Sequence, residues 1–551
     1  MTLHRRQVLA GAATGVLASI GATAPGARAR TAPQTGPRRA DPDYGALAQS
    51  LDGRLVTPGD RDYDEARQLF QPRYDAVRPG AVAYPAHPGD VAACLDFARR
   101  SAVLVVPRGG GHGYAGWSTR EAGLVIDTGA MAEVALDPGP GSEPGPGSEP
   151  ESGSEPGPGS EPGPGSAPGS GTGVRIGAGA RLGDVNSVLA ARGLAVPTGL
   201  CPSVGIAGLT LGGGLGLSSR SWGATSDRLT GMTVVTPDGT VREVGADREP
   251  ELFWALRGGG GGNFGVVTEF RFRTHPVSDC AFAELRWPAD GSPAVLRGWQ
   301  RWLEALPDPF WSQVEFTVDG GPVGAPAVRV LCLDGGLAEL ERQLTRLSDL
   351  VGGPPRDSWT VVRGYGDTVR AMAGCPDRSS AACRLPGSLP GHDPQGRLGR
   401  DSYAARSDFW APDGLTEAAA SAVLAALRRY AGSVPRGGFG VVQFDGVCGG
   451  ALNRIPARAT AFAHRSAGFL AQYLVYWPGA APAADTVRHQ GWLDGLWQDL
   501  RPWAGGAAYQ NYADPKLTGW REAYYGPNLA RLEEVRRRYD PDRLLRFPQA
   551  V

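Results

Sequence analysis

The sequence predicts an α+β protein with more than one domain, and three observations indicate this class. The chain has 551 residues, which is more than one hydrophobic core usually organises. From Gly80 onward, a strand-like run, a helix that opens near Pro88 and the apolar run VLVVP follow one another. After Pro276, glycine runs become rare and tryptophans become frequent. We therefore place a domain boundary near residue 276.

The other elements follow in chain order. The run LVIDT and the residues up to Leu136 are strand-like, and residues 174–194 read as a strand and then a helix. The stretch TEFRFRTHP is another strand. The last helix is expected from Asn528 to Tyr539, because Asp540 and Pro541 stop it.

Residues 138–171 form a low-complexity insertion. They repeat the unit E-P-G-P-G-S and hold no apolar side chain larger than alanine or proline, so we expect them to be disordered. Strand-like residues flank the repeat on both sides. It therefore interrupts a surface connection within one domain, and such insertions cost little closure entropy.

The N-terminal residues resemble an export signal. Arg5 and Arg6 precede a weakly apolar run that ends at the small-residue site Ala27–Ala29. The paired arginines predict a twin-arginine (Tat) signal over residues 1–29 and a secreted protein. The Tat route carries folded proteins, usually with a cofactor loaded.

The composition narrows the function classes. Hydrophobic residues make up 41% and charged residues 20%, as in ordinary soluble proteins. The net charge of −1 predicts no nucleic-acid partner, and no later apolar run is long enough to span a membrane. The seven cysteines include no C-x-x-C pair and the histidines are scattered, so we expect no metal. Whether Cys375 and Cys383 pair stays open.

Three glycine-rich loops, each beside a strand, carry the functional signal. They lie at Pro107–Gly113 (PRGGGHG), Gly199–Leu229 and Gly258–Gly265. None is a P-loop, because the G-K-S/T sequence is missing. Glycine costs roughly 0.5–1 kcal/mol relative to alanine in regular structure, so these clusters indicate backbone that lies close to a ligand. We infer a large phosphate-bearing cofactor along this domain.

At these motifs the chain resembles a known family. PRGGGHGYAGWS, GLCPSVGIAGLTLGGGLG, WALRGGGGGNFGVVTEF and YQNYADPKLTGWREAYYGPNLARL occur in the order found in berberine bridge enzyme-like FAD-linked oxidases, of the vanillyl-alcohol oxidase or PCMH-type FAD-binding superfamily. The resemblance covers about residues 45–551 without the insertion. It implies a two-subdomain FAD-binding domain over 45–276, a substrate domain over 277–504 with an antiparallel sheet backed by helices, and a segment 505–551 that returns to the FAD domain.

The resemblance implies a bicovalently bound FAD. His112 matches the family histidine that bonds to the 8α carbon, and Cys201 matches the cysteine that bonds to C6 of the ring. Imidazole nitrogen and thiolate are the nucleophiles that such attachment needs. The family pattern also places these residues at the pyrophosphate, the dinucleotide, the adenine side or the ring edge: Arg108, Gly109, Gly110, Gly111, Gly113, Tyr114, Val204, Gly205, Gly208, Leu209, Gly212, Gly265, Val267, Tyr525 and Asn528.

The resemblance also implies catalytic roles. Tyr512 of YQNY is the expected base, with a pKa lowered by its neighbours, and Tyr509 is the alternative. A tyrosine that only anchors the C-terminal segment is also consistent with the motif. Val204 matches a position beside the oxygen pocket, where valine accompanies oxidases, so O2 is the expected acceptor.

The substrate is the least determined feature. Trp410, Trp477, Tyr403 and Tyr476 either stack on a sugar or flat polycycle or belong to the core. The motif set is most similar to that of bacterial secondary-metabolite oxidases, acting for example on an antibiotic glycoside or an alkaloid-like compound. A mono- or oligosaccharide oxidase is the second hypothesis. A flavoprotein that binds a drug without turnover is the third.

Overall fold

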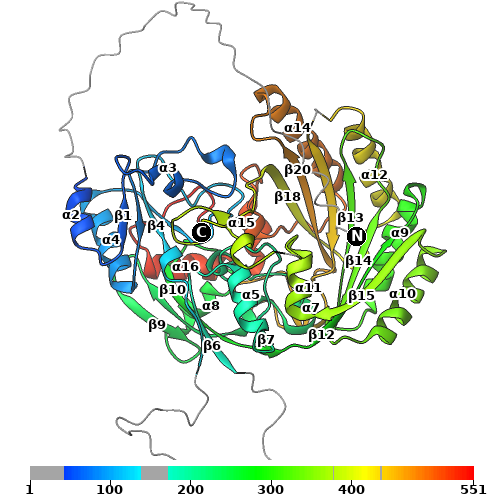
Figure 1. Cartoon of the computed structure of the whole chain (residues 1–551), viewed down its shortest axis with the longest axis horizontal. Coiled ribbons are helices and arrows are strands. Elements are labelled where there is room, and N and C mark those ends of the chain that lie inside the picture. The colour runs from blue at the N-terminus through cyan, green and yellow to red at the C-terminus, as the bar shows by residue number, and fades with distance from the viewer. Residues whose placement is uncertain (1–41, 138–171, 377, 435–436) are drawn as a thin grey trace, which may run out of the picture.

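The computed structural model describes residues 42–137, 172–376, 378–434 and 437–551. The predicted signal at 1–29 and the insertion at 138–171 lie outside the described residues. Figure 1 shows two lobes: the first contains the strands up to β11, and the second contains a large sheet with helices on one face. This arrangement confirms the expected α+β class.

The first lobe begins with a four-stranded sheet in the order β1-β2-β4-β3. Strands β2, β3 and β4 are parallel, and β1 pairs with β2 in the antiparallel sense. The parallel strands are short and apolar because both faces of the sheet are covered. The elements of this part are α2 (Tyr44–Gln49), β1 (Arg54–Val56), α3 (Tyr63–Ala66), β2 (Ala81–Tyr84), α4 (Pro88–Ser101), β3 (Val105–Arg108) and β4 (Leu124–Asp127).

A second, five-stranded antiparallel sheet completes this lobe, in the order β5-β6-β10-β8-β9. Its buried side chains form a continuous core with α5, α6, α8 and α16. The last strand, β11, ends at Pro276, and the next sheet begins at Asp279. The elements are β5 (Val134–Leu136), β6 (Gly173–Gly177), α5 (Leu182–Ala190), β7 (Leu194–Ala195), α6 (Ile206–Leu211), α7 (Ser219–Trp222), β8 (Leu229–Val235), β9 (Val241–Gly245), α8 (Pro250–Leu256), β10 (Val266–Arg273) and β11 (His275–Pro276).

The second lobe contains a seven-stranded antiparallel sheet in the order β15-β12-β14-β13-β19-β20-β18. Helices α9, α10, α12 and α14 cover one face (Figure 1). The elements are β12 (Asp279–Arg286), α9 (Ser292–Glu304), β13 (Phe310–Val318), β14 (Ala327–Cys332), α10 (Leu337–Val351), β15 (Asp357–Gly364), α11 (Tyr365–Met372), β16 (Leu385–Pro386), β17 (His392–Asp393), β18 (Ser402–Trp410), α12 (Glu417–Ala431), β19 (Phe439–Asp445), α13 (Gly450–Arg454), β20 (Phe469–Trp477) and α14 (Ala483–Leu500).

Successive side chains along these strands point to opposite faces of the sheet, so each strand contributes to two separate clusters. On β20, Tyr473 and Trp477 belong to the core under the helices, whereas Leu474 and Tyr476 belong to a cluster that includes Tyr114 of the first lobe. The helix-free face of the sheet is therefore turned toward the first lobe near β18, β19 and β20.

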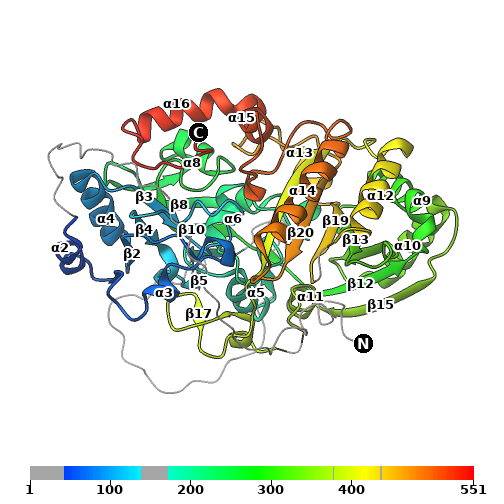
Figure 2. The same ribbon diagram turned by 90° about the horizontal axis from the view of Figure 1, so that it is seen from above.

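The C-terminal segment returns to the first lobe. It contains α15 (Trp520–Tyr525) and α16 (Leu529–Tyr539), which lie beside α8 in Figure 2. Helix α16 begins one residue after the predicted start, with Asn528 at its N-cap position. Cys375 and Cys383 form a disulfide. Within the described residues, no helix has the length and apolar character needed to cross a membrane.

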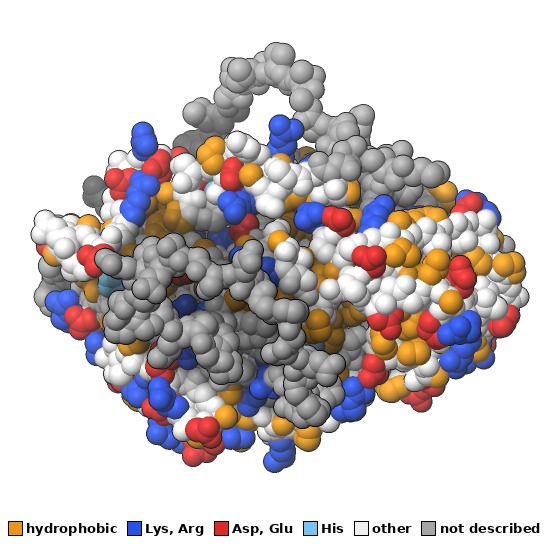
Figure 3. Space-filling view, turned by 60° about the horizontal axis from the view of Figure 1, so that its bottom comes forward, with side chains coloured by type: hydrophobic (Ala, Val, Ile, Leu, Met, Phe, Trp, Pro, Cys, Tyr) orange, Lys and Arg blue, Asp and Glu red, His pale blue; other side chains and the backbone are white. Residues whose placement is uncertain are grey.

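Charged side chains of both signs are interspersed over the face shown in Figure 3. This mixed surface agrees with the net charge of −1.

Candidate functional site

The first two glycine-rich loops meet backbone to backbone. Gly109–Gly111 follow β3, and Gly205 precedes α6. A Cβ atom at Gly110 would lie less than 3.0 Å from the nitrogen of Gly205, and the reverse also holds. Gly111 has a φ of 69°, in the left-handed region. Both contact positions therefore require glycine, because a side chain would push the two loops apart.

The third glycine-rich loop joins the same region. The N–H groups of Gly258 and Gly260 both donate to the carbonyl of Leu211, at 3.1 and 2.8 Å. Farther along, Gly265 lies against a carbonyl of β8, and Val267 is buried in the sheet core. The structure thus gives Gly265 and Val267 a packing role between β10 and β8.

Helix α6 links the second loop to the C-terminal segment. The side-chain N–H of Asn511 donates to the carbonyl of Leu209 at 2.9 Å, and the Asn511 side chain occupies the space that a Cβ atom at Gly212 would need. A Cβ atom at Gly208 would meet nothing within 4 Å, so open space borders this turn. Val204 is partly buried against the core of the first lobe.

His112 and Cys201 lie on the first and second loops. Nε2 of His112 is 2.9 Å from the hydroxyl oxygen of Ser203, two residues after Cys201. Burial, together with the positive charge of Arg181, lowers the pKa of His112 to about 3. The imidazole is therefore neutral, as a nucleophile must be. Cys201 is a free, exposed thiol.

Tyr512 and Tyr509 lie in different surroundings. The Tyr512 ring stacks on Tyr114, with centroids 5.2 Å apart and planes inclined by 3°. The Tyr509 hydroxyl accepts hydrogen bonds from the N–H of Gly214 at 3.1 Å and from Asn511 at 2.9 Å, and the side chain is buried. The hydroxyl of Tyr509 thus anchors the C-terminal segment.

The expected lowering of the Tyr512 pKa is wrong. Burial raises the pKa of Tyr512 well above its ordinary value, and the negative charge of Asp445 raises it further. The charged groups that act on the Tyr512 pKa are Asp445, Cys201 and two tyrosines, and each of them raises it, so none stabilises a phenolate. Tyr512 is therefore protonated and needs an acceptor for its own proton.

Asp445, which the sequence reading missed, is the carboxylate whose charge acts on Tyr512. It ends β19, and its Oδ1 accepts a hydrogen bond from the indole N–H of Trp311 at 2.7 Å. Burial raises the pKa of Asp445 to about 7, and the Trp311 hydrogen bond opposes the shift. A lone carboxylate that ends the apolar run FGVVQFD was the available sequence signal.

Two glutamines extend the polar row on this face. Gln443 of β19 and Gln472 of β20 are cross-strand partners, and Gln443 donates to Gln472 at 2.6 Å. Gln472 in turn donates to the Tyr114 hydroxyl at 2.6 Å. The row from Gln443 to Tyr114 thus lies beside Tyr512.

The four aromatic residues proposed for stacking fall into two groups. Tyr403 lies edge-on to Tyr114 at 5.2 Å and 5.4 Å from Tyr476, so both tyrosines face the site. Trp410 and Trp477 belong to the core on the opposite face of the sheet. Of the two possibilities given for these aromatic residues, membership of the core is therefore correct for Trp410 and Trp477.

Tyr525 and Asn528 contact protein groups away from His112. The hydroxyl of Tyr525 lies next to Gly260 of the third loop. The Asn528 amide donates to three carbonyls, including that of Ala457 at 2.7 Å. These contacts hold α15 and α16 against the first lobe, and the described residues show no contact from either side chain to His112 or Cys201.

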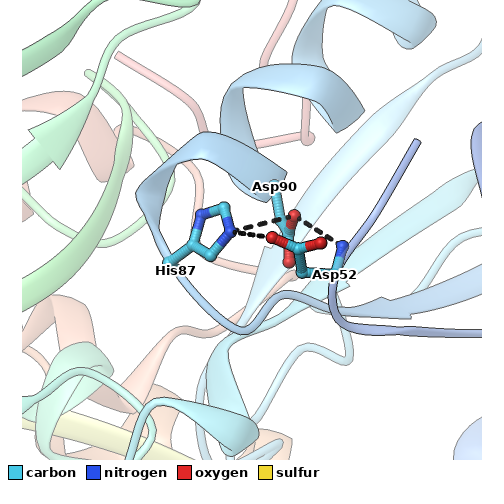
Figure 4. Close-up of side chains that lie close together, drawn as sticks. All are labelled: Asp52, His87 and Asp90. Carbon is cyan, nitrogen blue, oxygen red and sulfur yellow. Dashed lines mark hydrogen bonds and ion pairs between the residues drawn. The ribbon is translucent and has the colours of Figure 1, made fainter.

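Figure 4 shows a separate cluster formed by Asp52, His87 and Asp90. Nε2 of His87 is 2.8 Å from Asp52, while its Nδ1 accepts the N–H of Gly89 at 3.1 Å. Asp90 accepts backbone N–H groups, including that of Gly53 at 2.9 Å. These hydrogen bonds account for the cluster as a support for the start of α4.

The first glycine-rich loop offers free donors that fit a dinucleotide. Arg108 is buried, and its guanidinium pairs with Asp127 and donates to the carbonyl of Ala66, yet its Nη1 has no hydrogen-bond partner. Among the described residues, the N–H groups of Gly109–Gly111 also lack an acceptor. Free N–H groups with open space beside them, next to two nucleophiles, are what an FAD would need.

Two family models match the chain. The model described as "FAD binding domain" matches residues 79–142 and 169–245, and the model "Berberine and berberine like" matches residues 508–551. These segments hold the first two glycine-rich loops and Tyr512.

Relatives match over nearly the whole chain. The FAD-linked oxidoreductase YgaK of Bacillus subtilis (strain 168) is 30% identical over 509 residues, which cover 91% of this chain and 97% of YgaK. The (R)-6-hydroxynicotine oxidase of Paenarthrobacter nicotinovorans is 29% identical with the same coverage. A solved chitooligosaccharide oxidase superposes with a TM-score of 0.74 at 25% identity, over 92% of this chain and 98% of that protein. The chain therefore belongs to the berberine bridge enzyme-like FAD-linked oxidoreductases of the PCMH-type FAD-binding superfamily.

Proposed function

We propose that the protein is an oxidase that removes hydride from a hydroxyl-bearing carbon of a sugar, either free or carried by a secondary metabolite. The row Gln443, Gln472 and Tyr114 beside Tyr512 is the observation that carries this proposal. Amide and phenol groups both donate and accept hydrogen bonds, as sugar hydroxyls do. An apolar alkaloid would leave the remaining donors and acceptors of this row without partners, which costs about 1–3 kcal/mol for each group that it buries.

The polar side chains of the site have separate roles in proton transfer and in binding the substrate. Tyr512 takes the proton of the substrate hydroxyl and passes its own phenolic proton to Asp445. FAD, held by the glycine-rich loops with His112 and Cys201, would supply the hydride acceptor and pass the two electrons on to O2, which would give hydrogen peroxide. Tyr114 and Gln472 orient the sugar ring. Val204, beside the second loop, is the residue that we expect to keep the oxygen path open.

The names of two relatives agree with this class of reaction. One oxidises 6-hydroxynicotine and the other chitooligosaccharides, so both are oxidases of small molecules. The polar row in this chain favours the second type of substrate. A drug-binding protein without turnover would have no use for a proton acceptor beside Tyr512.

An anaerobic screen of flavin reduction tests the substrate class. Mono- and oligosaccharides, glycosides and cyclic amines are each mixed with the protein, and the flavin absorbance is followed. We expect bleaching by sugars or glycosides, and peroxide after air is admitted. Bleaching by amines alone would contradict the sugar assignment. Tight binding without bleaching would indicate a binding protein.

We further propose that the flavin is attached through both His112 and Cys201. The neutral imidazole and the free, exposed thiol on neighbouring loops support this attachment. Wild-type protein is expected to keep its yellow colour in the acid-precipitated pellet, because the bonds survive denaturation. The double variant His112→Ala/Cys201→Ala should release FAD into the supernatant, and Cys94→Ala serves as the control. Colour lost from the wild-type pellet would contradict the assignment.

The role of Asp445 predicts a pH profile. With a pKa of about 7, Asp445 is a proton acceptor only above that pH. We expect kcat/KM for flavin reduction to rise through about pH 7, and Asp445→Asn to lower it about 100-fold and to remove this inflection. A wild-type profile in the Asn variant would place the acceptor elsewhere.

A less stable fold would not explain the lower kcat/KM expected for Asp445→Asn. The folded pKa of Asp445 is raised, so the folded state binds more protons than the unfolded state between the two pKa values. Stability from this group therefore falls as pH rises toward 7, and Asp445→Asn removes that loss. Thermal unfolding at pH 8 is the control measurement.

We propose that the protein is exported by the Tat route, because Arg5 and Arg6 precede the apolar run and the Ala27–Ala29 site. Substitution of both arginines by lysine is expected to retain the protein inside the cell. Unchanged secretion of the lysine variant would contradict the proposal.

A further inference from the structure

A pocket that is partly open to solvent lies beside the first glycine-rich loop. Arg108, Gly109–Gly111 and Arg181 line its inner wall. Residues 384–400, here called the strap, form the outer wall; they follow the disulfide and lead into β18. The cavity is thus bounded by both lobes.

Three side-chain links hold the strap on the first lobe. Arg384 pairs with Asp184 at 2.7 Å, and Nδ1 of His392 lies 2.7 Å from a carboxylate oxygen of Glu65. Arg400 pairs with Asp75 and donates to the carbonyl of Leu69. Figure 2 shows β17 of the strap on the same side of the molecule as α3 and α5, which carry Glu65 and Asp184. Arg384 and Arg400 of the strap are thus each paired with an acidic residue of the first lobe.

Arg181 is the charge in this wall that is left unbalanced. It precedes α5, is only 6% exposed, and its Nη1 is buried without a hydrogen-bond partner. Its guanidinium lies against Gly391 of the strap. Among the described residues it forms no ion pair with an acidic group, and burial lowers its pKa. A buried cation without a partner is strongly unfavourable, so the site requires an anion.

The neighbouring groups do not supply that anion. Asp127 and Asp184 are the acids whose charges act on Arg181, and their carboxylates are already paired with Arg108 and Arg384. Glu65 is bonded to His392 and to backbone N–H groups of the strap. The cavity therefore holds a guanidinium of Arg181 that forms no ion pair among the described residues, the free Nη1 of Arg108 and the free N–H groups of the loop.

We propose that Arg181 binds a phosphate-type anion in this cavity, together with Nη1 of Arg108 and the N–H groups of Gly109–Gly111. The guanidinium fork matches the oxygen geometry of phosphate, and successive backbone N–H groups form a concave anion site. The diphosphate of FAD is the first source, because His112 of the same loop experiences the charge of Arg181. Free inorganic phosphate is the second source. The assignment rests on the FAD cofactor and is independent of the proposed sugar substrate.

The test compares Arg181→Met with a matched control, Arg192→Met. Arg192 lies just beyond α5, is exposed and only donates to the carbonyl of Val188. The readouts are the flavin-to-protein ratio of the purified holoprotein and the ³¹P resonances of its FAD. We expect Arg181→Met to lower the flavin ratio several-fold and to shift the diphosphate resonances, because a charge-assisted contact is lost. Arg192→Met should match the wild type.

Two further measurements separate the sources and guard against misfolding. Arg181→Lys keeps the charge without the fork, and we expect it to retain more flavin than Arg181→Met. Inorganic phosphate is also titrated into the wild-type holoprotein and followed by its ³¹P line width. Phosphate binding that Arg181→Lys weakens, with FAD resonances unchanged, assigns the site to free phosphate. Unchanged flavin content, unchanged FAD resonances and no phosphate binding would overturn the proposal.

Discussion

Replacing Tyr512 by phenylalanine is expected to slow flavin reduction by ~10²–10⁴-fold, the range for removal of a general acid or base. The phenyl ring still stacks on Tyr114, so substrate affinity should change little. Only the path of the hydroxyl proton to Asp445 is lost. Stopped-flow reduction under anaerobic conditions measures the effect directly, because it isolates the chemical step from reoxidation by O2.

Tyr509→Phe is the matched comparison for this experiment. Its hydroxyl is committed to Gly214 and Asn511, so its removal should lower the free energy of unfolding by about 1 kcal/mol and leave the reduction rate nearly unchanged. A slow Tyr509→Phe variant beside a fast Tyr512→Phe variant would reverse the two assignments.

Gly110→Ala is expected to give the second large effect. The new methyl group would meet the backbone nitrogen of Gly205 at less than 3.0 Å, and neither main chain can move without opening the loop contact. Overpacking of this kind costs about 1–3 kcal/mol. We expect a lower thermal midpoint and a several-fold lower flavin content, measured by calorimetry and by absorbance.

Gly113→Ala separates this clash from the general effect of losing a glycine. A Cβ atom at Gly113 would have no neighbour within 4 Å. Neither Gly110 nor Gly113 has a positive φ, so backbone strain is the same in both variants. Equal losses in the two variants would show that the loop contact is not the cause.

The glycine-rich loops and the α+β class were predictable because their signals are repeated along the chain. Three clusters of a residue that destabilises regular structure require a common physical cause. Asp445, Gln472 and Arg181 are single polar residues in otherwise ordinary elements. Their importance depends on which strands pair and on which face meets the first lobe, and a local pattern does not contain that information.

The incorrect expectation for the Tyr512 pKa has the same origin. The sequence around YQNY does not reveal the group that matters, because Asp445 comes from a strand of the other lobe. The two tryptophans illustrate the reverse case. Successive side chains of a strand point to opposite faces of the sheet, so Trp410 and Tyr403 of β18 lie on different faces, as do Trp477 and Tyr476 of β20. The packing of the sheet then shows which face meets the site.

The pairing of β5 with β6 has a practical consequence. Leu136 lies opposite Val174 in an antiparallel ladder, so the chain leaves this edge of the sheet after β5 and re-enters it beside the point of departure. The N–H of Asp137 donates to the carbonyl of Gly173 at 2.9 Å, so the described ends of this connection lie at one place. This position therefore suits the grafting of an autonomous module, such as a carbohydrate-binding or fluorescent domain, without new demands on the rest of the fold.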